Sequence, residues 1–146
     1  MQSPTPGSTH VPEQQLDRGI LDTSVVIDLE RLDASQLPRE VAVTSITMAE
    51  LAAGPHATSD AAERARRQDR LQRAEAAFDP IPFDAAAARA YGRIYAAVVA
   101  QGRKARGPRA VDVLIAAVAA AAELPLCTRN PDDFAGLDDL VTVVTV

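Results

Sequence analysis

Residues 20–29 read Ile-Leu-Asp-Thr-Ser-Val-Val-Ile-Asp-Leu, the strongest single indication of the fold in this chain. Apolar residues on both sides of Asp22 predict a buried strand that runs into a turn and a helix, which places the Asp22 carboxylate at the carboxyl end of the strand. Ligands of open α/β sheets bind at that end. No Lys or Arg adjoins Asp22, and a carboxylate among apolar neighbours is unfavourable without a positive partner, so we expect a bound cation.

The composition predicts one globular domain. The chain has 146 residues, 47% of them hydrophobic, which is enough for a single core. Its net charge of -5 argues against binding nucleic acid by bulk electrostatics alone, so such a contact requires local basic patches. The single cysteine, Cys127, excludes a disulfide framework and a cysteine zinc site, and it favours a reducing compartment, for which the cytoplasm is the expected location.

The N-terminal residues 1–18 are expected to be a disordered leader, followed by a domain at 19–146. The leader is rich in Pro, Ser, Thr and Gln and lacks the apolar run of a signal peptide. No segment reaches the roughly 18 consecutive apolar residues of a membrane span, so no membrane association is expected.

Strands alternate with helices along the domain. We expect strands at 19–22, 41–46, 80–83, 125–128 and 141–146, and helices at 24–32, 47–55, 59–78, 85–100 and 110–124. The expected N-caps are Thr23 or Ser24 for the first helix, Thr47 for the second and Asp84 for the fourth. This order predicts an α/β fold with a mostly parallel central sheet and helices on both faces.

Three acidic residues, Asp22, Glu50 and Asp112, interrupt apolar segments instead of lying on a solvated face. All three can meet at the carboxyl edge of the sheet. Hard divalent cations such as Mg²⁺ or Mn²⁺ take oxygen ligands and are typically held by one or two carboxylates together with a substrate phosphate. Such an ion activates water and neutralises a leaving oxygen, so the pattern points to phosphodiester cleavage.

Each acid also has a purely structural explanation. Asp112 can complement the positive end of its helix, Glu50 can be the returning half of a capping box with Thr47, and Asp22 can cap the helix that follows it. Taken singly, these explanations stay open for all three residues, and only the combination favours a metal site.

Four segments resemble, in order and spacing, the motifs of PIN-domain ribonucleases, and more narrowly those of VapC-type toxins of bacterial toxin-antitoxin pairs. They are residues 21–25 (Leu-Asp-Thr-Ser-Val), 48–51 (Met-Ala-Glu-Leu), 109–117 (Arg-Ala-Val-Asp-Val-Leu-Ile-Ala-Ala) and 128–134 (Thr-Arg-Asn-Pro-Asp-Asp-Phe). The resemblance implies a three-layer α/β/α sandwich, an Mg²⁺ or Mn²⁺ ion in an acidic pocket, and endonucleolytic cleavage of RNA.

The resemblance also implies roles for the acids. Asp22 and Asp112 fall on the principal metal ligands of the family, and Glu50 on the third acid of the pocket. The fourth acidic position is occupied by Asn130, which offers a carbonyl oxygen but no charge. The missing carboxylate is therefore expected from Asp132 or Asp133.

Hydroxyl residues are expected to support these acids. Thr23 and Ser24 resemble the residues that follow the first acid in the family and steady its orientation. Thr128, after a short strand, either binds a carboxylate or substrate phosphate or merely ends the strand.

Basic residues suggest where RNA lies. Arg103, Lys104, Arg106 and Arg109 precede Asp112 and can place phosphates beside the metal. By contrast, the arginines of 59–78 alternate with acids and are interpreted as ion pairs on a solvated face. By resemblance, the chain forms a homodimer and a hetero-oligomer with a cognate VapB-type antitoxin; an apolar stripe on 59–78 offers a surface for a partner helix.

Three alternatives belong to other classes. An aspartyl-phosphate phosphatase needs a second Asp where this chain has Ser24, and a receiver-like signalling module needs a lysine near a late strand, whereas the only lysine, Lys104, lies between two helices. The third is a non-catalytic PIN fold that binds RNA or a partner, with its acidic site degraded at Asn130.

Overall fold

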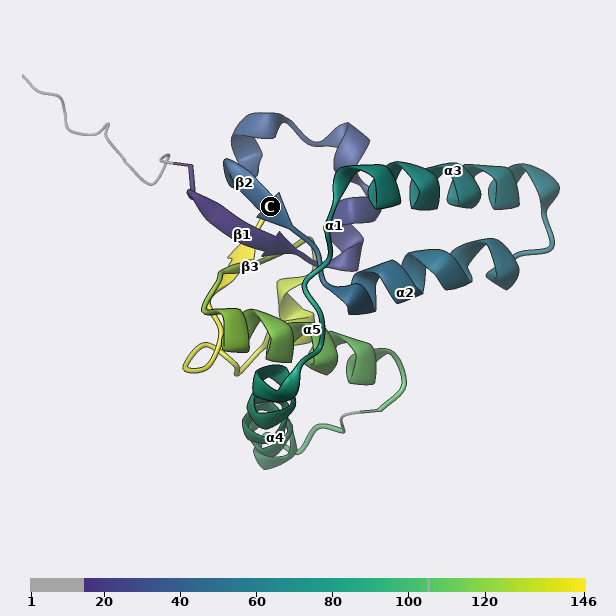
Figure 1. Cartoon of the computed structure of the whole chain (residues 1–146). Helices are drawn as coiled ribbons and strands as arrows, with labels where there is room; N and C mark the ends of the chain where they lie inside the picture. The colour runs from purple at the N-terminus through teal and green to yellow at the C-terminus, as the bar shows by residue number, and fades with distance from the viewer. Residues whose placement is uncertain (1–14, 105) are drawn as a thin grey trace, which may run out of the picture.

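The structure, a computed structural model, describes residues 15–104 and 106–146 (Figure 1). Most of the expected leader lies outside the described residues. Residues 15–18, also expected in the leader, belong to the fold. The side-chain Nε2 of Gln15 donates to the carbonyls of Ala34 and Leu37 at 2.9 and 2.6 Å. Within these described ranges, no helix combines the length and apolar character needed to cross a bilayer.

The central sheet has four parallel strands in the order β2-β1-β3-β4. These strands are β1 (Arg18–Leu21), β2 (Glu40–Ala42), β3 (Leu126–Thr128) and β4 (Val143–Thr145). The strand expected at 80–83 is wrong, because this segment makes only one bridge, between Ile81 and Thr44. The predicted parallel sheet is confirmed, and its parallel direction brings the carboxyl ends of β1 and β3 to one edge.

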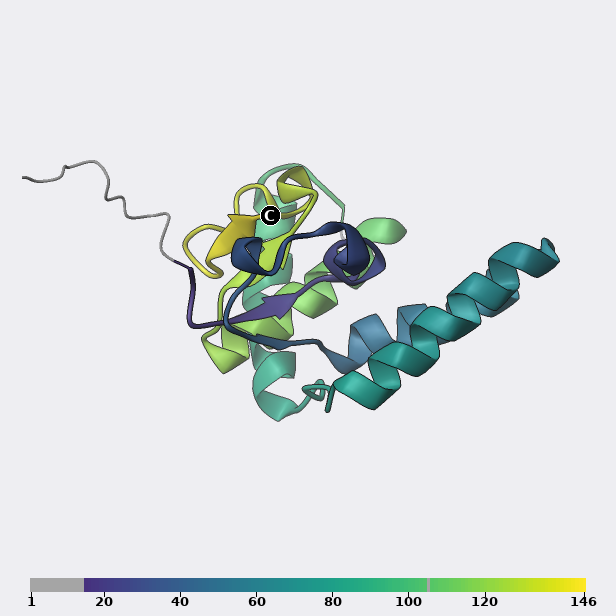
Figure 2. The same ribbon diagram turned by 90° about the horizontal axis from the view of Figure 1, so that it is seen from above.

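In residues 15–104 and 106–146, the sheet is accompanied by five α-helices and four short 3-10 helices. The α-helices are α1 (Thr23–Ile27), α2 (Ser45–Ala53), α3 (Ala61–Ala77), α4 (Ala85–Ala100) and α5 (Pro108–Ala122). The 3-10 helices are η2 (Leu29–Arg31), η3 (Ala34–Gln36), η4 (Gly54–Ala57) and η5 (Pro131–Phe134). Figures 1 and 2 show α2 and α3 side by side, extending away from the sheet.

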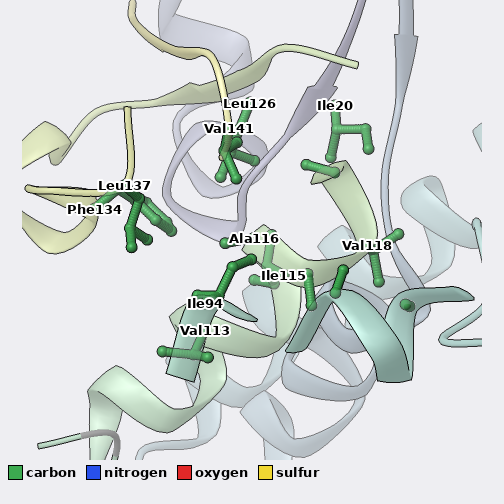
Figure 3. Packing of buried hydrophobic residues seen from close by; sticks show 14 of the residues in the cluster. Ile20, Ile94, Val113, Ile115, Ala116, Val118, Leu126, Phe134, Leu137 and Val141 are labelled. Atoms are coloured by element: carbon green, nitrogen blue, oxygen red, sulfur yellow. The ribbon is translucent and has the colours of Figure 1, made fainter. Parts of the chain in front are cut away.

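Alternate residues of each strand point to opposite faces of the sheet, and each face carries its own apolar core. This arrangement confirms the predicted three-layer sandwich. On one face, Ile20 and Leu126 pack with α4, α5 and the segment around Phe134 (Figure 3). On the other, Leu21 and Cys127 pack with residues of α1, α2 and α3. This two-residue alternation is the normal consequence of strand geometry. The narrow alanine-rich surface of α5 lets it lie between the sheet and α4, with Val113, Ile115 and Val118 all buried.

Two predicted N-caps are wrong, because a residue closer to the strand takes the cap. Asp22 caps α1, which confirms the alternative explanation of this acid over Thr23 and Ser24. The predicted end of this helix at residue 32 is also wrong, since α1 ends at Ile27. Thr44, rather than Thr47, caps α2, so the strand before it ends at Ala42. The Asp84 cap is confirmed. On α4, Ile94 and Val98 are buried as predicted, whereas Tyr95 is 46% exposed.

Candidate active site

Asp22 lies at the carboxyl end of β1, buried to 5% exposure. Its Oδ1 atom accepts hydrogen bonds from the Val25 amide at 3.2 Å and from the Ser24 hydroxyl at 2.5 Å. Within the part of the chain that the structure describes, its Oδ2 atom accepts none. The cap therefore fixes the carboxylate and leaves one oxygen for a ligand.

Ser24 links this carboxylate to the neighbouring strand. Its hydroxyl donates to Asp22 and accepts from the Arg129 amide at 3.1 Å, just after β3. The expected role of Ser24 in orienting the first acid agrees with these contacts. The arrangement ties the ends of β1 and β3 together at the edge of the sheet where Asp22 lies.

Glu50 lies on α2 and is held by two threonines. Thr23 of α1 donates to Glu50 Oε1, and the Thr23 and Thr47 hydroxyls are 3.0 Å apart. A carboxylate only accepts, so the Thr23 proton goes to Glu50 and Thr47 donates to Thr23. The capping-box explanation of Glu50 is thereby wrong, because the Thr44 hydroxyl caps α2 by accepting from the Thr47 amide at 3.1 Å.

Asp112 lies near the N-terminal end of α5 and is half-buried. Its side chain makes no hydrogen bond or ion pair with any residue that the structure describes. Burial is the main cause that raises the pKa of Asp112 to about 7; the negative charges of Asp133, Asp22 and Glu50 raise it further, and Arg109 opposes them. The charges of Asp22 and Glu50 therefore reach Asp112 from elements that are far apart in the sequence.

The three candidates for the fourth acidic position lie in η5 or at its N-cap. Asn130 and Asp132 are exposed, whereas Asp133 is half-buried and its charge is the first of those that raise the pKa of Asp112. Phe134 anchors this segment at 1% exposure in the core. Of the three candidates, Asp133 is the one whose charge acts on Asp112.

The predicted basic residues divide into two pairs. Arg109 donates to the Asp133 carbonyl at 2.9 Å, and Arg103 approaches the carbonyls of Asp132 and Ala135 at 3.5 Å. These two arginines thus hold η5 against the start of α5. Lys104 and Arg106 are exposed and stay candidates for RNA contact.

Thr128 at the end of β3 is fully buried, and its hydroxyl accepts from the Asn130 amide at 3.0 Å. This bond turns the chain after the strand. In the described residues, it makes no side-chain hydrogen bond to a carboxylate, so the alternative in which Thr128 ends the strand accounts for its contacts.

A divalent cation fits this arrangement in charge and donor type. No three histidine, cysteine, aspartate or glutamate side chains in residues 15–104 and 106–146 form a ready-made cluster of metal ligands. A hard cation such as Mg²⁺ nevertheless requires only one or two carboxylates, because it keeps several waters. The unpaired Asp112 carboxylate and the open oxygen of Asp22, each near other acids, are the ligands that such an ion prefers.

Comparison with known proteins matches this geometry to a family. The family model of the PIN domain matches residues 20–140, which contain all four sequence motifs. A protein named ribonuclease VapC5, from Mycobacterium tuberculosis, is 40% identical over 128 residues that cover 86% of this chain and 91% of the relative. The chain belongs to the PIN-domain family. Ribonuclease VapC8 of the same species, 39% identical over 108 residues, covers 73% of this PIN protein and 95% of its own length.

Solved structures give the same result for the PIN fold. VapBC-5 from Mycobacterium tuberculosis, described as a member of the VapBC family of toxin-antitoxin systems, superimposes with a TM-score of 0.75 at 38% identity, covering 89% of this chain and 98% of the other. FitAcB from Neisseria gonorrhoeae gives 0.64 at 26% identity, covering 86% and 95%. The predicted resemblance to PIN-domain proteins is confirmed.

Sequence reasoning missed two supports of the PIN site. The sequence pattern places Thr44 in a strand and Thr47 at the N-cap of α2. In the structure, Thr44 is the cap, and Thr47 belongs to the chain of hydroxyl groups that ends on Glu50. Both threonines precede a good helix sequence, so local pattern favours either as a cap. The spacing of the two threonines could have identified the cap. Thr44 lies three residues before Thr47, and an N-cap hydroxyl accepts from a backbone amide at that distance along the chain.

Proposed function

We propose that this PIN protein is a metal-dependent endoribonuclease that acts as the toxin of a toxin-antitoxin pair. The observation that carries the proposal is the unpaired Asp112 carboxylate, whose pKa is raised first by burial and then by the negative charges of Asp133, Asp22 and Glu50. Such a concentration of negative charge is suited to a cation. The named relatives are ribonucleases, which supports RNA as the substrate.

The side chains divide the work at this site. Asp22 and Asp112 would hold the ion, with Glu50 as the third acid and Asp133 as the fourth. The bonds from Val25 and Ser24 orient Asp22, and the Thr23–Thr47 pair orients Glu50. When bound, Mg²⁺ or Mn²⁺ activates water for in-line attack and stabilises the charge that develops on the phosphoryl and leaving oxygens.

Removal of divalent ions is expected to abolish RNA cleavage. Protein treated with EDTA and then dialysed should cleave a mixed RNA pool at background rate, and added Mg²⁺ or Mn²⁺ should restore cleavage. The measurement is fragment mapping on a gel, with and without metal. Binding of RNA without cleavage at any metal concentration would instead support the non-catalytic PIN alternative.

Asp133 is expected to contribute to metal affinity, and its neighbour Asp132 provides a matched control. We expect Asp133→Asn to weaken Mn²⁺ binding by roughly 10-fold, within the range for residues that support a metal site, because it removes a charge near Asp112. Asp132→Asn removes the same charge from an exposed position and should change affinity little. Isothermal titration calorimetry with Mn²⁺ measures both; a larger effect of Asp132→Asn would assign the fourth position to that residue.

An antitoxin partner is supported by a groove between α1 and α3. It has a volume of about 270 Å³, and its apolar lining includes Val26, Ile27, Leu29, Ala74 and Phe78. The Ile27 side chain is 47% exposed, and a partner helix in the groove would bury it. For the proposed homodimer, Tyr95 and Val99 lie one turn apart on α4 and are 46% and 49% exposed.

A further inference from the structure

A second cavity adjoins the candidate active site on the side of α3. Its volume is about 320 Å³, and it is lined by Thr23, Ile27, Glu50, Leu51, Gly54, Glu63, Arg67 and Arg70. Thr23 and Glu50 belong to the candidate active site, whereas the two arginines come from α3. The cavity therefore joins the acidic centre to a pair of guanidinium groups.

Arg67 already binds the protein through two of its three guanidinium nitrogens. Its Nε donates to Glu63 at 2.8 Å and its Nη1 to the Gly54 carbonyl at 2.9 Å, which fastens α3 to the end of α2. Arg66 also pairs with Glu63, at 2.8 Å. The hydrogen bonds from Arg67 and then Arg66 lower the pKa of Glu63, so this carboxylate stays ionised and is neutralised by two cations.

Arg70 differs from the other arginines of α3. Arg64 donates to the carbonyls of Pro55 and Thr58, and Arg73 pairs with Glu30 and Asp69. Arg70 is partly buried, yet in the described part of the chain it makes no hydrogen bond or ion pair. A partly buried guanidinium without a partner is unfavourable unless an anion meets it.

We propose that Arg70 binds a phosphate of the RNA next to the bond that is cleaved. This inference rests on the proposed function and names a substrate contact for it. The planar guanidinium fork suits phosphate oxygens. α3 carries five arginines and three acidic residues, so it is positive in a chain with net charge -5.

Arg70 lies between two hollows, because it also lines the groove proposed for an antitoxin helix. The cavity that Arg70 shares with Glu50 favours RNA over the carboxylate of a protein partner as its ligand. Glu50 and Arg70 line the same space, so its occupant must present an anion to Arg70 and also reach the cation site. A nucleic-acid chain carries a phosphate on every nucleotide. One strand in the cavity therefore offers one phosphate to the cation site and a neighbouring phosphate to Arg70.

The test measures RNA binding rather than cleavage. In full-length protein carrying Asp22→Asn, a fluorescent single-stranded RNA is titrated at several salt concentrations, with and without Arg70→Gln. We expect Arg70→Gln to weaken binding about 5- to 10-fold and to reduce the slope of log K against log salt by about 0.7, the loss of one phosphate contact on a single strand. Mn²⁺ affinity, measured in protein with native Asp22, should not change.

The matched control is Arg93→Gln, which removes an exposed arginine of α4 away from the cavity. It should leave the RNA affinity and the salt slope unchanged. Arg70→Lys keeps the charge without the guanidinium fork, so its RNA affinity should lie between those of the Arg70→Gln and Arg93→Gln proteins. It also serves as the second variant if circular dichroism shows that Arg70→Gln fails to fold.

Equal affinities and slopes for the Arg70→Gln and Arg93→Gln proteins would overturn the proposal. So would a loss of affinity for a glutamate oligomer without a loss for RNA, because it would assign Arg70 to a protein carboxylate. Failure of the proposed function itself is a separate result: wild-type protein would then cleave no RNA in Mg²⁺ or Mn²⁺, whatever Arg70 binds.

Discussion

Asp22→Asn is expected to lower kcat/KM for RNA cleavage by about 10³-fold or more while the protein stays folded. Asparagine removes the negative charge but keeps an oxygen that can accept the bonds from Val25 and Ser24. Asparagine and aspartate are comparable N-caps, so α1 should keep its start. The substitution therefore separates the chemical role of Asp22 from its role in the helix.

The measurement is single-turnover cleavage of a labelled RNA, together with a denaturant unfolding curve. Asp84→Asn is the matched control, because Asp84 caps α4 through the Ala87 amide in the same way and belongs to no acidic pocket. It should cleave like wild type. Undiminished, EDTA-sensitive cleavage by the Asp22→Asn protein would remove Asp22 from the site.

Asp112→Asn is expected to abolish cleavage and, at the same time, to stabilise the metal-free protein at pH 8. The loss of activity follows from removal of a carboxylate that would hold the ion. The gain in stability follows from the pKa of Asp112, which burial and then Asp133, Asp22 and Glu50 raise from 3.8 to about 7. A group of this kind disfavours folding once the unfolded chain can ionise it.

The sign of the pH dependence follows from proton binding. Below pH 3.8, Asp112 is protonated in both states and contributes nothing. Between pH 3.8 and about 7, the unfolded chain loses this proton and the folded chain keeps it, so the free energy of unfolding falls as the pH rises. Above that interval Asp112 is ionised in both states, and the decrease in the free energy of unfolding stays constant.

The expected gain for Asp112→Asn at pH 8 is about 1–2 kcal/mol. The full shift at roughly 1.36 kcal/mol per pKa unit would give more, but the carboxylate is only half-buried and solvent screens it. Denaturant unfolding in EDTA at pH 8 and pH 3 measures the difference, which should nearly vanish at pH 3, where Asp112 is protonated in both states. Added Mg²⁺ should then stabilise wild type and leave the variant unchanged. A variant less stable than wild type at pH 8 would contradict the assigned pKa.

The class of fold and the identity of the acids follow from local sequence patterns. Strand alternation and helix periodicity are local properties, so the parallel sheet, the amphipathic α3 and the Asp84 cap could be predicted from neighbouring residues. Asp22, Glu50 and Asp112 were recognised because each interrupts an apolar run. That signal requires no knowledge of long-range contacts.

The contacts that these residues make depend instead on long-range packing. Thr44 takes the cap of α2, which releases Glu50 to accept from Thr23, a residue 27 positions earlier. The burial of Phe134 anchors the segment that carries Asp133, and, after burial of Asp112 itself, the charge of Asp133 is the next cause that raises the pKa of Asp112. These outcomes depend on contacts between segments far apart in the chain, which exist only after parallel strands have brought their carboxyl ends to one edge of the sheet.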